Sequence, residues 1–463
     1  VSFIIAIIEV YFLRQTNIRD LLVSTIIMIF IFLISIFLCG GVFDSSYDGN
    51  SYHKEAIGYL KEGWNPIYET AEEFGKKESL TSSQAIWLNS YPKTTWFYGA
   101  SVYKITDNIE TSKSFNFIIV FVVFFVIVYL INKYYNKKLL AFLMAILTAV
   151  FPIMCQQIFS LYLDGFLGFC LLLVLIYMYL LLKNDMSKEY FFIIGALLII
   201  IINIKYTGLM YAGIFCLGYY IYYIINRVKE KEYKRILIYT GKFLIILFVG
   251  LFVVGSNSYI KNLVIHKNPL YPLIGKDKVD IMTYLQPESF TKKSPIEKNF
   301  YSLFSYTANI GVFNHGEPIL KRPFTKTINE IQQFSEDTRI GGFGVYFSGI
   351  LIISVIIILI DFIIGLFYKK YDDLIMFGIP FLLIILIMFC LSDGWWARYS
   401  PQVWFIPLMA AFILLRSNKK IAMFLGILLF LLCFYNSFII FRQIVNLRIP
   451  ASNLTRQTLE QNR

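Results

Sequence analysis

Two carboxylates follow directly after the first long apolar run of the sequence, and one of them is a candidate general base. They are Asp44 and Asp48, and Asp48 stands in the segment YDGNSYH, residues 47–53. A carboxylate beside apolar surface at a membrane edge can have a raised pKa and take a proton from a substrate hydroxyl. Tyr47 and His53 flank Asp48 and are predicted to contact the substrate. The alternative is that Asp48 only caps the helix that follows.

Three further charged residues stand at the ends of apolar runs, on the side of the membrane where we expect Asp48. They are Asp164, Lys205 and Arg398, and a charge in such a place is costly unless it is paired. Lys205 and Arg398 are predicted to hold a phosphate group, with Lys93 as a third cation. Asp164 is another candidate catalytic carboxylate. The alternatives are that the cations only anchor the chain among lipid headgroups, and that Asp164 only forms a structural salt bridge.

The run WWARY, residues 395–399, combines aromatic rings with the guanidinium of Arg398. Trp395, Trp396 and Tyr399 are predicted to form a stacking surface for a sugar. The alternative is an aromatic belt at the membrane interface.

A metal site is a further hypothesis. The three histidines of the sequence, His53, His266 and His315, all lie in predicted loops on the side of the membrane where we expect Asp48. Oxygen ligands from these carboxylates with a single His would suit Mg²⁺ or Mn²⁺. The spacing matches no standard metal motif, so we assign no metal ligand and no firm cofactor.

Eleven apolar runs must position these residues. The chain is 57% hydrophobic and 16% charged, with a mean hydropathy of +0.64, whereas a soluble protein is ~45–50% apolar and ~25% charged. We therefore predict one all-α domain over residues 1–463, a polytopic integral membrane protein with about eleven transmembrane helices. Residues 1–13, too short to span, would make twelve if they belong to a truncated helix. The predicted runs are 20–42, 114–132, 139–157, 162–182, 190–204, 207–225, 236–256, 346–368, 374–391, 402–415 and 421–441.

Basic residues recur in every second loop between these runs, which is the pattern of cytoplasmic loops and accounts for the net charge of +12. The charge therefore indicates a membrane partner and no nucleic acid. The other loops are expected to face outward, as is the tail from about residue 442. Two of these loops are large, 43–113 and 257–345. The helix centres carry almost no charge, which argues against transport through the membrane.

The order of these motifs resembles the GT-C fold glycosyltransferases, in particular the branch that uses polyprenyl-phosphate sugars and is related to aminoarabinose and protein-mannosyl transferases. The resemblance covers about residues 20–415 and rests on five short motifs. They are Asp48 after the first helix, SYPK at 90–93, Asp164 opening a later helix, KYTG at 205–208 and RYSP at 398–401. The acidic pair of the family reads Asp-Gly here, which weakens a metal argument. The segments NPLYP at 268–272 and WWARY resemble a bacterial subgroup linked to cell-surface polysaccharides.

The resemblance implies an inverting glycosyltransferase that moves a hexose or pentose from a polyprenyl-phosphate donor, such as an undecaprenyl-phosphate sugar, to an acceptor hydroxyl. Asp48 would be the general base, with Asp44 and Asp164 secondary. Lys93, Lys205 and Arg398 would balance the charge of the phosphate leaving group. The acceptor would be a glycan, a lipid or a protein. The site would face outward from a bacterial cytoplasmic membrane, in cell-envelope glycan or glycolipid modification.

Two other functions compete with this one. A polysaccharide polymerase or ligase acting on undecaprenyl-linked glycans is also polytopic with a large outward loop, but such enzymes usually rely on Arg and His of late loops. A transporter of lipid-linked sugars would give transport without a covalent product. Replacement of Asp48 separates the first alternative from the glycosyltransferase.

Overall fold

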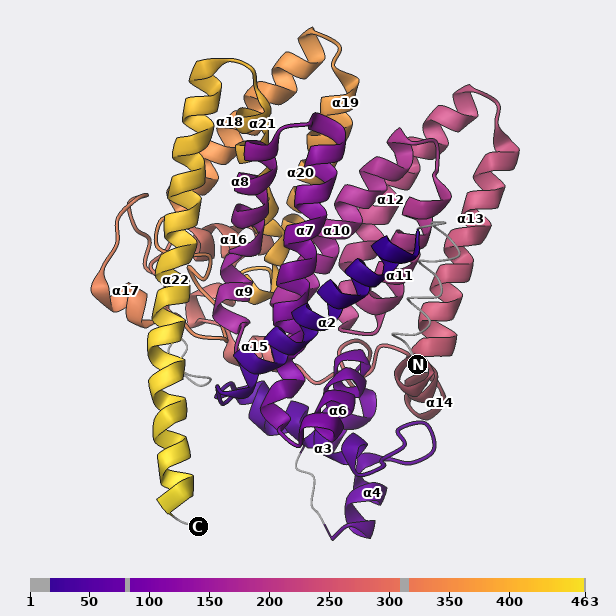
Figure 1. Cartoon of the computed structure of the whole chain (residues 1–463), viewed down its shortest axis with the longest axis vertical. Helices are drawn as coiled ribbons and strands as arrows, with labels where there is room; N and C mark the ends of the chain where they lie inside the picture. The colour runs from indigo at the N-terminus through magenta and orange to yellow at the C-terminus, as the bar shows by residue number, and fades with distance from the viewer. Residues whose placement is uncertain (1–16, 80–83, 309–315, 462–463) are drawn as a thin grey trace.

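The long apolar runs form helices in the computed structural model of the chain, which describes residues 17–79, 84–308 and 316–461 (Figure 1). Within these residues, eight helical stretches are long and apolar enough to cross a membrane, and the only β-structure is two isolated bridges. This confirms the predicted all-α polytopic membrane protein. The stretches are Ile18–Gly40 (α2), Ile109–Tyr135 (η2, Ile109–Ser114, and α7, Phe115–Tyr135), Asp164–Lys183 (α10), Tyr206–Lys229 (α12), Tyr233–Val254 (α13, Tyr233–Phe248, and η3, Val249–Val254), Phe347–Phe367 (α18), Tyr371–Cys390 (α19, Tyr371–Asp373, η6, Leu374–Gly378, and α20, Ile379–Cys390) and Lys420–Gln461 (α22).

The other predicted runs form shorter helices, and one of them is broken. Residues 139–157 form α8 (Lys138–Ala149) and α9 (Pro152–Gln157) instead of one continuous helix. The break falls at Pro152, which has no backbone N–H to continue a helix. The remaining two runs form α11 (Lys188–Ile202) and α21 (Phe405–Arg416).

Short helices gather at one end of the bundle, which we call the site end. In Figure 1, α3, α4, α6 and α14 lie there, opposite the α7–α8, α12–α13 and α18–α19 connections, which mark the basic-loop end. The short elements are η1 (Gly49–His53), α3 (Lys54–Lys61), α4 (Ala71–Lys77), α5 (Ala85–Ser90), α6 (Thr94–Thr106), η4 (Ser256–Ile260), α14 (Lys261–His266), α15 (Ile281–Leu285), η5 (Glu288–Phe290), α16 (Pro295–Leu303), α17 (Ile328–Gln332), η7 (Ala397–Tyr399) and η8 (Pro401–Trp404). The apolar stretch 1–13 and His315 lie outside the described residues.

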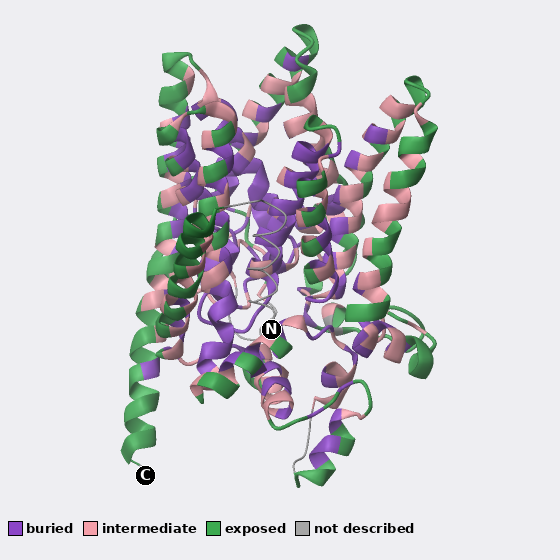
Figure 2. Ribbon diagram, turned by 45° about the vertical axis from the view of Figure 1, so that its right-hand side comes forward, coloured by how far each residue is buried: buried purple, intermediate pink, exposed green. Residues whose placement is uncertain are grey.

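The helix α10 forms the centre of the bundle. Of its most apolar window, 78% is buried inside the protein, compared with 6% for α2 and for the α13 stretch. Figure 2 shows this difference as a buried interior surrounded by helices with exposed outer faces. Those outer faces are rich in Ile, Leu and Phe, and such a surface is stable against lipid rather than water.

Hydrogen bonds from Lys261 and Asn262 help to tie the long loops to each other. The Lys261 ammonium donates to the backbone carbonyls of Pro66 and Glu69, at 2.8 Å each. The Asn262 side chain donates to the carbonyl of Ser90 at 3.1 Å. The beginning of the loop 257–345 therefore packs against the loop 43–113.

The helix α22 continues past the predicted end of its span at residue 441 and contacts both long loops. The Ser452 hydroxyl accepts from the backbone N–H of Phe43 at 2.9 Å, and Arg456 donates to the carbonyl of Gly41 at 2.8 Å. Arg448 forms an ion pair with Glu336. The predicted tail from residue 442 is thus helical. It contacts the start of the loop 43–113 and, through Glu336, the loop 257–345.

Candidate active site

Arg398 is the centre of a buried charged cluster at the site end. Its Nη1 lies 3.2 Å from Asp48 Oδ2 and 3.6 Å from Asp164 Oδ2, and its Nε lies 3.0 Å from Asp337 Oδ1. The Nε contact is an ion pair without hydrogen-bond geometry. The ring of Tyr162 faces the guanidinium, with its centroid 4.5 Å from Cζ. Four segments far apart in the sequence thus meet at one guanidinium.

Asp48 reaches this cluster from the turn that begins η1. Burial raises the pKa of the Asp48 carboxyl, the Asp337 charge adds to the rise, and the Arg398 guanidinium opposes it. The side chain is still 20% exposed, so a substrate can approach it. A carboxylate with a raised pKa and an open side has the properties of a general base.

Asp164 pairs more closely with Lys205 than with Arg398. Lys205 Nζ lies 2.5 Å from Asp164 Oδ1, and the Gln157 amide donates to Oδ2 at 3.2 Å. The Asp164 side chain is 2% exposed and Lys205 is 22% exposed. Burial lowers the pKa of Lys205, and the Asp164 charge opposes that change. Asp164 therefore contacts Lys205 directly and opposes the effect of burial on its pKa, and its role as a secondary catalytic carboxylate stays a prediction.

The ammonium of Lys205 also lies over an aromatic ring. Its Nζ is 4.2 Å from the centroid of Tyr399, whose backbone carbonyl accepts from the hydroxyl of Tyr211. Tyr399 thus lies at the cluster, as the sequence predicted, but it faces a cation of the protein.

Asp337 belongs to the cluster, although it was not among the site residues predicted from the sequence. Its Oδ2 accepts from Arg339 Nη2 at 2.8 Å, and its Oδ1 accepts from Trp396 Nε1 at 3.1 Å. The backbone N–H of Arg398 donates to the carbonyl of Thr338 at 3.2 Å, which aligns the two segments. Five consecutive polar residues, 335–339, lie just before Ile340 and the GGFG run at 341–344. That stretch, which contains Glu336, Asp337 and Arg339, was the sequence feature from which Asp337 could have been predicted as a site residue.

A small cavity opens beside the cluster, with a volume of about 40 Å³. Asp48, Asp164, Lys205 and Arg398 line it together with a ring of aromatic side chains. These aromatic residues are Tyr52, His53, Tyr91, Trp96, Tyr162 and Tyr206. The volume holds one or two small groups and not a whole sugar, so a donor must displace some of the lining residues.

His53 lies in this lining as an uncharged group. Its Nδ1 accepts from Trp96 Nε1 at 2.6 Å, and burial lowers the pKa of His53 to about 3. The ring stays neutral at any physiological pH. Its contribution to a substrate contact is therefore that of a neutral imidazole.

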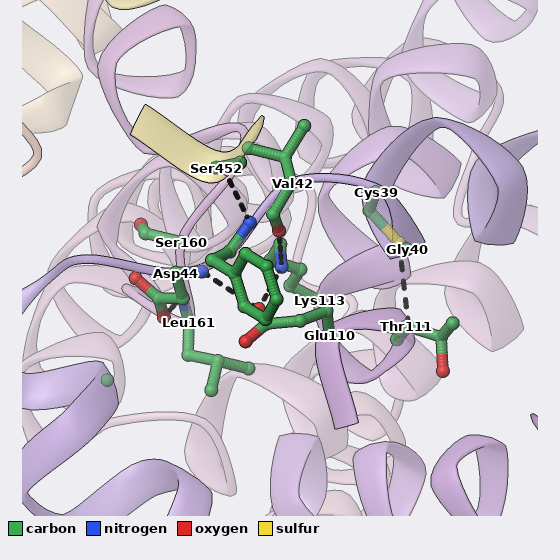
Figure 3. Close-up of polar contacts among 12 residues, drawn as sticks. Cys39, Gly40, Val42, Asp44, Glu110, Thr111, Lys113, Ser160, Leu161 and Ser452 are labelled. Atoms are coloured by element: carbon green, nitrogen blue, oxygen red, sulfur yellow. Dashed lines mark hydrogen bonds and ion pairs between the residues drawn. The ribbon is translucent and has the colours of Figure 1, made fainter. Parts of the chain in front are cut away.

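Asp44 lies away from the cavity and anchors the loop that carries Asp48. Its carboxylate accepts from the backbone N–H groups of Ser46 and Leu161, both at 2.8 Å. Figure 3 shows it beside Ser160 and Leu161 of the α9–α10 connection. A Cβ on Gly49 would overlap the Asp44 carboxylate, so this glycine makes room for Asp44 and not for a substrate.

An ion-pair network supports Asp44 from the other side (Figure 3). Glu110 accepts from the backbone N–H of Asp44 at 2.8 Å, and it pairs with Lys54 at 2.6 Å and with Lys113. Lys113 also donates to the carbonyl of Val42 at 2.6 Å. These contacts fix the backbone just before Asp48.

The structure does not bring Lys93 to the cluster. Its ammonium donates to the carbonyls of Asn89 and Tyr91 at 3.0 and 2.7 Å, and to Ser258 Oγ at 3.4 Å. The residue is 1% exposed, and burial lowers its pKa well below the usual range. Its role is to join the two long loops, which differs from the predicted phosphate contact.

The two tryptophans of the WWARY run do not form an open stacking surface. Trp395 and Trp396 are each 1% exposed. Trp395 packs on Phe290, and Trp396 lies between the guanidiniums of Arg339 and Arg398, at 4.3 and 5.0 Å. The rings support the cluster instead of facing a sugar. They do not face a sugar as predicted, because the loop 257–345 covers them.

Tyr47 lies outside the cavity lining and is 48% exposed. Its neighbour Asp48 points inward, because successive residues of this turn face different sides.

Three residues of the metal hypothesis, Asp48, Asp164 and His53, line the same cavity, whereas Asp44 and His266 lie outside its lining. Asp44 is held by backbone N–H groups, His53 by Trp96, and His266 stacks on Tyr271 at 3.6 Å. Among the described residues, no group of three or more His, Cys, Asp or Glu side chains is placed to hold a metal ion.

Comparison with known proteins gives one family match. The model of the dolichyl-phosphate-mannose-protein mannosyltransferase family matches residues 92–254, a segment that includes Asp164 and Lys205. No curated protein and no solved structure matches the chain. The match supports a membrane glycosyltransferase of the GT-C type, a class that uses a polyprenyl-phosphate sugar donor and an acceptor.

Proposed function

We propose that this protein transfers a sugar from a polyprenyl-phosphate donor to an acceptor hydroxyl, with inversion, and that Asp48 is the general base. One observation carries the proposal: the Asp48 carboxylate contacts Arg398 inside a cavity that also contains Lys205. A base and two phosphate-binding cations are thus within reach of one small volume.

The resting ion pair between Asp48 and Arg398 suggests how the base is activated. A carboxylate that is paired with a guanidinium is a weak base. When the donor phosphate enters, Arg398 and Lys205 turn to its oxygens, since a guanidinium binds phosphate with two parallel hydrogen bonds. Asp48 then loses the contact that lowers its pKa, and its basicity rises when the donor is in place.

The transfer step then needs no further group. Asp48 takes the proton of the acceptor hydroxyl while the hydroxyl oxygen attacks the anomeric carbon. The bond between that carbon and the phosphate oxygen breaks, and the polyprenyl phosphate leaves with the electron pair. Lys205 and Arg398 balance the negative charge that develops on it.

The setting we propose is the outer face of a bacterial cytoplasmic membrane, in cell-envelope glycan or glycolipid modification. The contacts between the two long loops at the site end support an acceptor site built from both. A glycan, a lipid or a protein segment is the acceptor.

The experiment is sugar transfer in proteoliposomes with a polyprenyl-phosphate sugar and an acceptor. Asp48→Asn keeps the shape and removes the proton acceptor, so turnover should fall ~10²–10⁴-fold while donor binding persists. The matched control is Asp107→Asn, because Asp107 is at the same end with its side chain 86% exposed. Near-normal turnover by Asp48→Asn would refute the assignment. A polymeric product in place of a single transferred sugar would favour the polymerase alternative.

A further inference from the structure

A second and larger cavity lies in the half of the bundle away from the charged cluster. It has a volume of about 380 Å³, compared with about 40 Å³ at Asp48. That volume is within the usual range of small-molecule sites, ~300–1,000 Å³. The helices α7, α8, α10, α12, α20 and α21 and the turn η6 enclose it.

The course of α10 shows that the two cavities are separate. Asp164, the first residue of this helix, lines the cavity at the site end, whereas Leu172 to Lys183 line the large one. A 20-residue helix is ~30 Å long, so the large cavity extends from mid-helix to the basic-loop end. Between the two, the ring of Phe151 packs on that of Phe169, with centroids 5.5 Å apart.

The interior of the large cavity is mostly apolar, and its charged residues, Lys183, Asp372 and Arg416, lie at the mouth. Leu172, Ile176, Met144, Phe405 and Leu408 are among the lining residues. An apolar space in a membrane protein favours a hydrocarbon chain over water, because water gains no hydrogen bonds there.

The mouth is a set of ion pairs centred on the short helix α19. Lys183 Nζ lies 2.7 Å from Asp372, and the Tyr179 hydroxyl donates to the same carboxylate at 2.9 Å. Arg416 lies 2.7 Å from Asp373. These pairs join α10 and α21 to α19 at the opening.

Two lysines beside the mouth add positive charge that no carboxylate of the described residues neutralises. Lys133 contacts the hydroxyl of Tyr190 at 3.2 Å, and Lys137 donates to the carbonyl of Arg416 at 2.7 Å. The Tyr190 hydroxyl that Lys133 contacts is hydrogen-bonded at 2.6 Å to that of Tyr134, a lining residue, and Arg416 itself lines the cavity. The rim is therefore cationic around an apolar interior.

We infer that this cavity holds one hydrocarbon chain of an anionic membrane lipid, with its headgroup among Lys183, Lys133 and Lys137. The apolar lining selects the chain, and the cationic rim selects the headgroup charge. This lipid enters from the basic-loop end, so it is distinct from any donor that places its phosphate at Arg398.

Native mass spectrometry of the detergent-purified protein tests the inference, with phosphatidylglycerol and phosphatidylcholine as probes. The wild type should retain one phosphatidylglycerol per chain and little phosphatidylcholine. Ile176→Trp fills the cavity and should lower retention at least roughly tenfold, because several buried methylenes are displaced. Leu217→Trp is the control, since Leu217 is 59% exposed on the outer face of α12. Lys183→Gln should remove the preference for phosphatidylglycerol.

A second measurement uses only the wild-type protein, so it does not depend on whether the variants fold. Phosphatidylglycerol with a diazirine in its acyl chain should label the α10 and α21 segments that line the cavity. Labelling confined to the exposed faces of α2 and α13 would overturn the inference, as would equal retention of both lipids by the wild type. Equal retention by the two Trp variants would overturn it as well.

Discussion

The ion pair between Asp164 and Lys205 makes a quantitative prediction about stability. Asp164→Asn removes the carboxylate and leaves Lys205 without its closest partner, with a side chain that is only 22% exposed. Removal of one partner from a buried pair costs ~3–5 kcal/mol, and we expect about 3 kcal/mol because Lys205 retains some contact with solvent. The pKa of Lys205, already lowered by burial, should fall further without the Asp164 charge.

The test is a double-mutant cycle with Lys205→Met. The double variant contains no uncompensated buried charge, so it should regain most of the stability that Asp164→Asn loses while remaining inactive. Unfolding by SDS in mixed micelles, followed by tryptophan fluorescence, measures the free energy of each variant. Asp107→Asn provides the matched exposed pair, with an expected loss of no more than ~1 kcal/mol.

Two results would refute this reasoning. If Asp164→Asn is destabilised by less than about 1 kcal/mol, the pair is not desolvated in the way that a buried pair is. If the double variant is no more stable than Asp164→Asn alone, the cost does not come from a stranded lysine.

Three further predictions concern Asp337, Asp44 and Lys93. Asp337→Asn removes a negative charge that raises the pKa of Asp48. The pKa of Asp48 should therefore fall, and the acid limb of the pH–rate profile should move to lower pH. A move to higher pH would contradict the role of Asp337 beside Asp48. Asp44→Asn loosens the loop before Asp48 and should lower turnover roughly ten- to a hundredfold with the acid limb in place; a displaced limb would make Asp44 a titrating catalytic group. Lys93→Met should leave donor affinity within about twofold of wild type, because Lys93 lies away from the cluster. Loss of a charge-assisted contact to the donor would cost ~1.5–3 kcal/mol and lower the affinity by more than twofold. Such a loss, measured by donor titration, would place Lys93 at the phosphate.

Much of the cluster could be predicted from the sequence because the membrane makes charge expensive. Asp164, Lys205 and Arg398 stand at the ends of apolar runs, where an unpaired charge is unfavourable, and the structure brings them together. Asp337 could not be found in this way. It lies in a long polar loop, where a charge is ordinary, and only the fold places it beside Arg398.

Other errors came from contacts that a linear sequence does not contain. Trp395 and Trp396 were expected to face a sugar, but the loop 257–345 covers them, as the packing of Phe290 on Trp395 shows. Lys93 was expected at the phosphate, but carbonyl groups of its own segment surround its ammonium. The break before α9 was not predicted either, although the sequence contains its cause, since Pro152 lies inside the predicted run 139–157.

The separation of Asp48 and Arg398 by 350 positions in the chain has a consequence for biosynthesis. At ~5–20 residues per second, the ribosome needs roughly 20 to 70 s after making Asp48 before Arg398 exists. During that time the first loop has left the membrane insertion machinery without the guanidinium that its carboxylate pairs with. The loop therefore closes only after Arg398 has been made, and a nascent chain released before that point would insert its helices without a site.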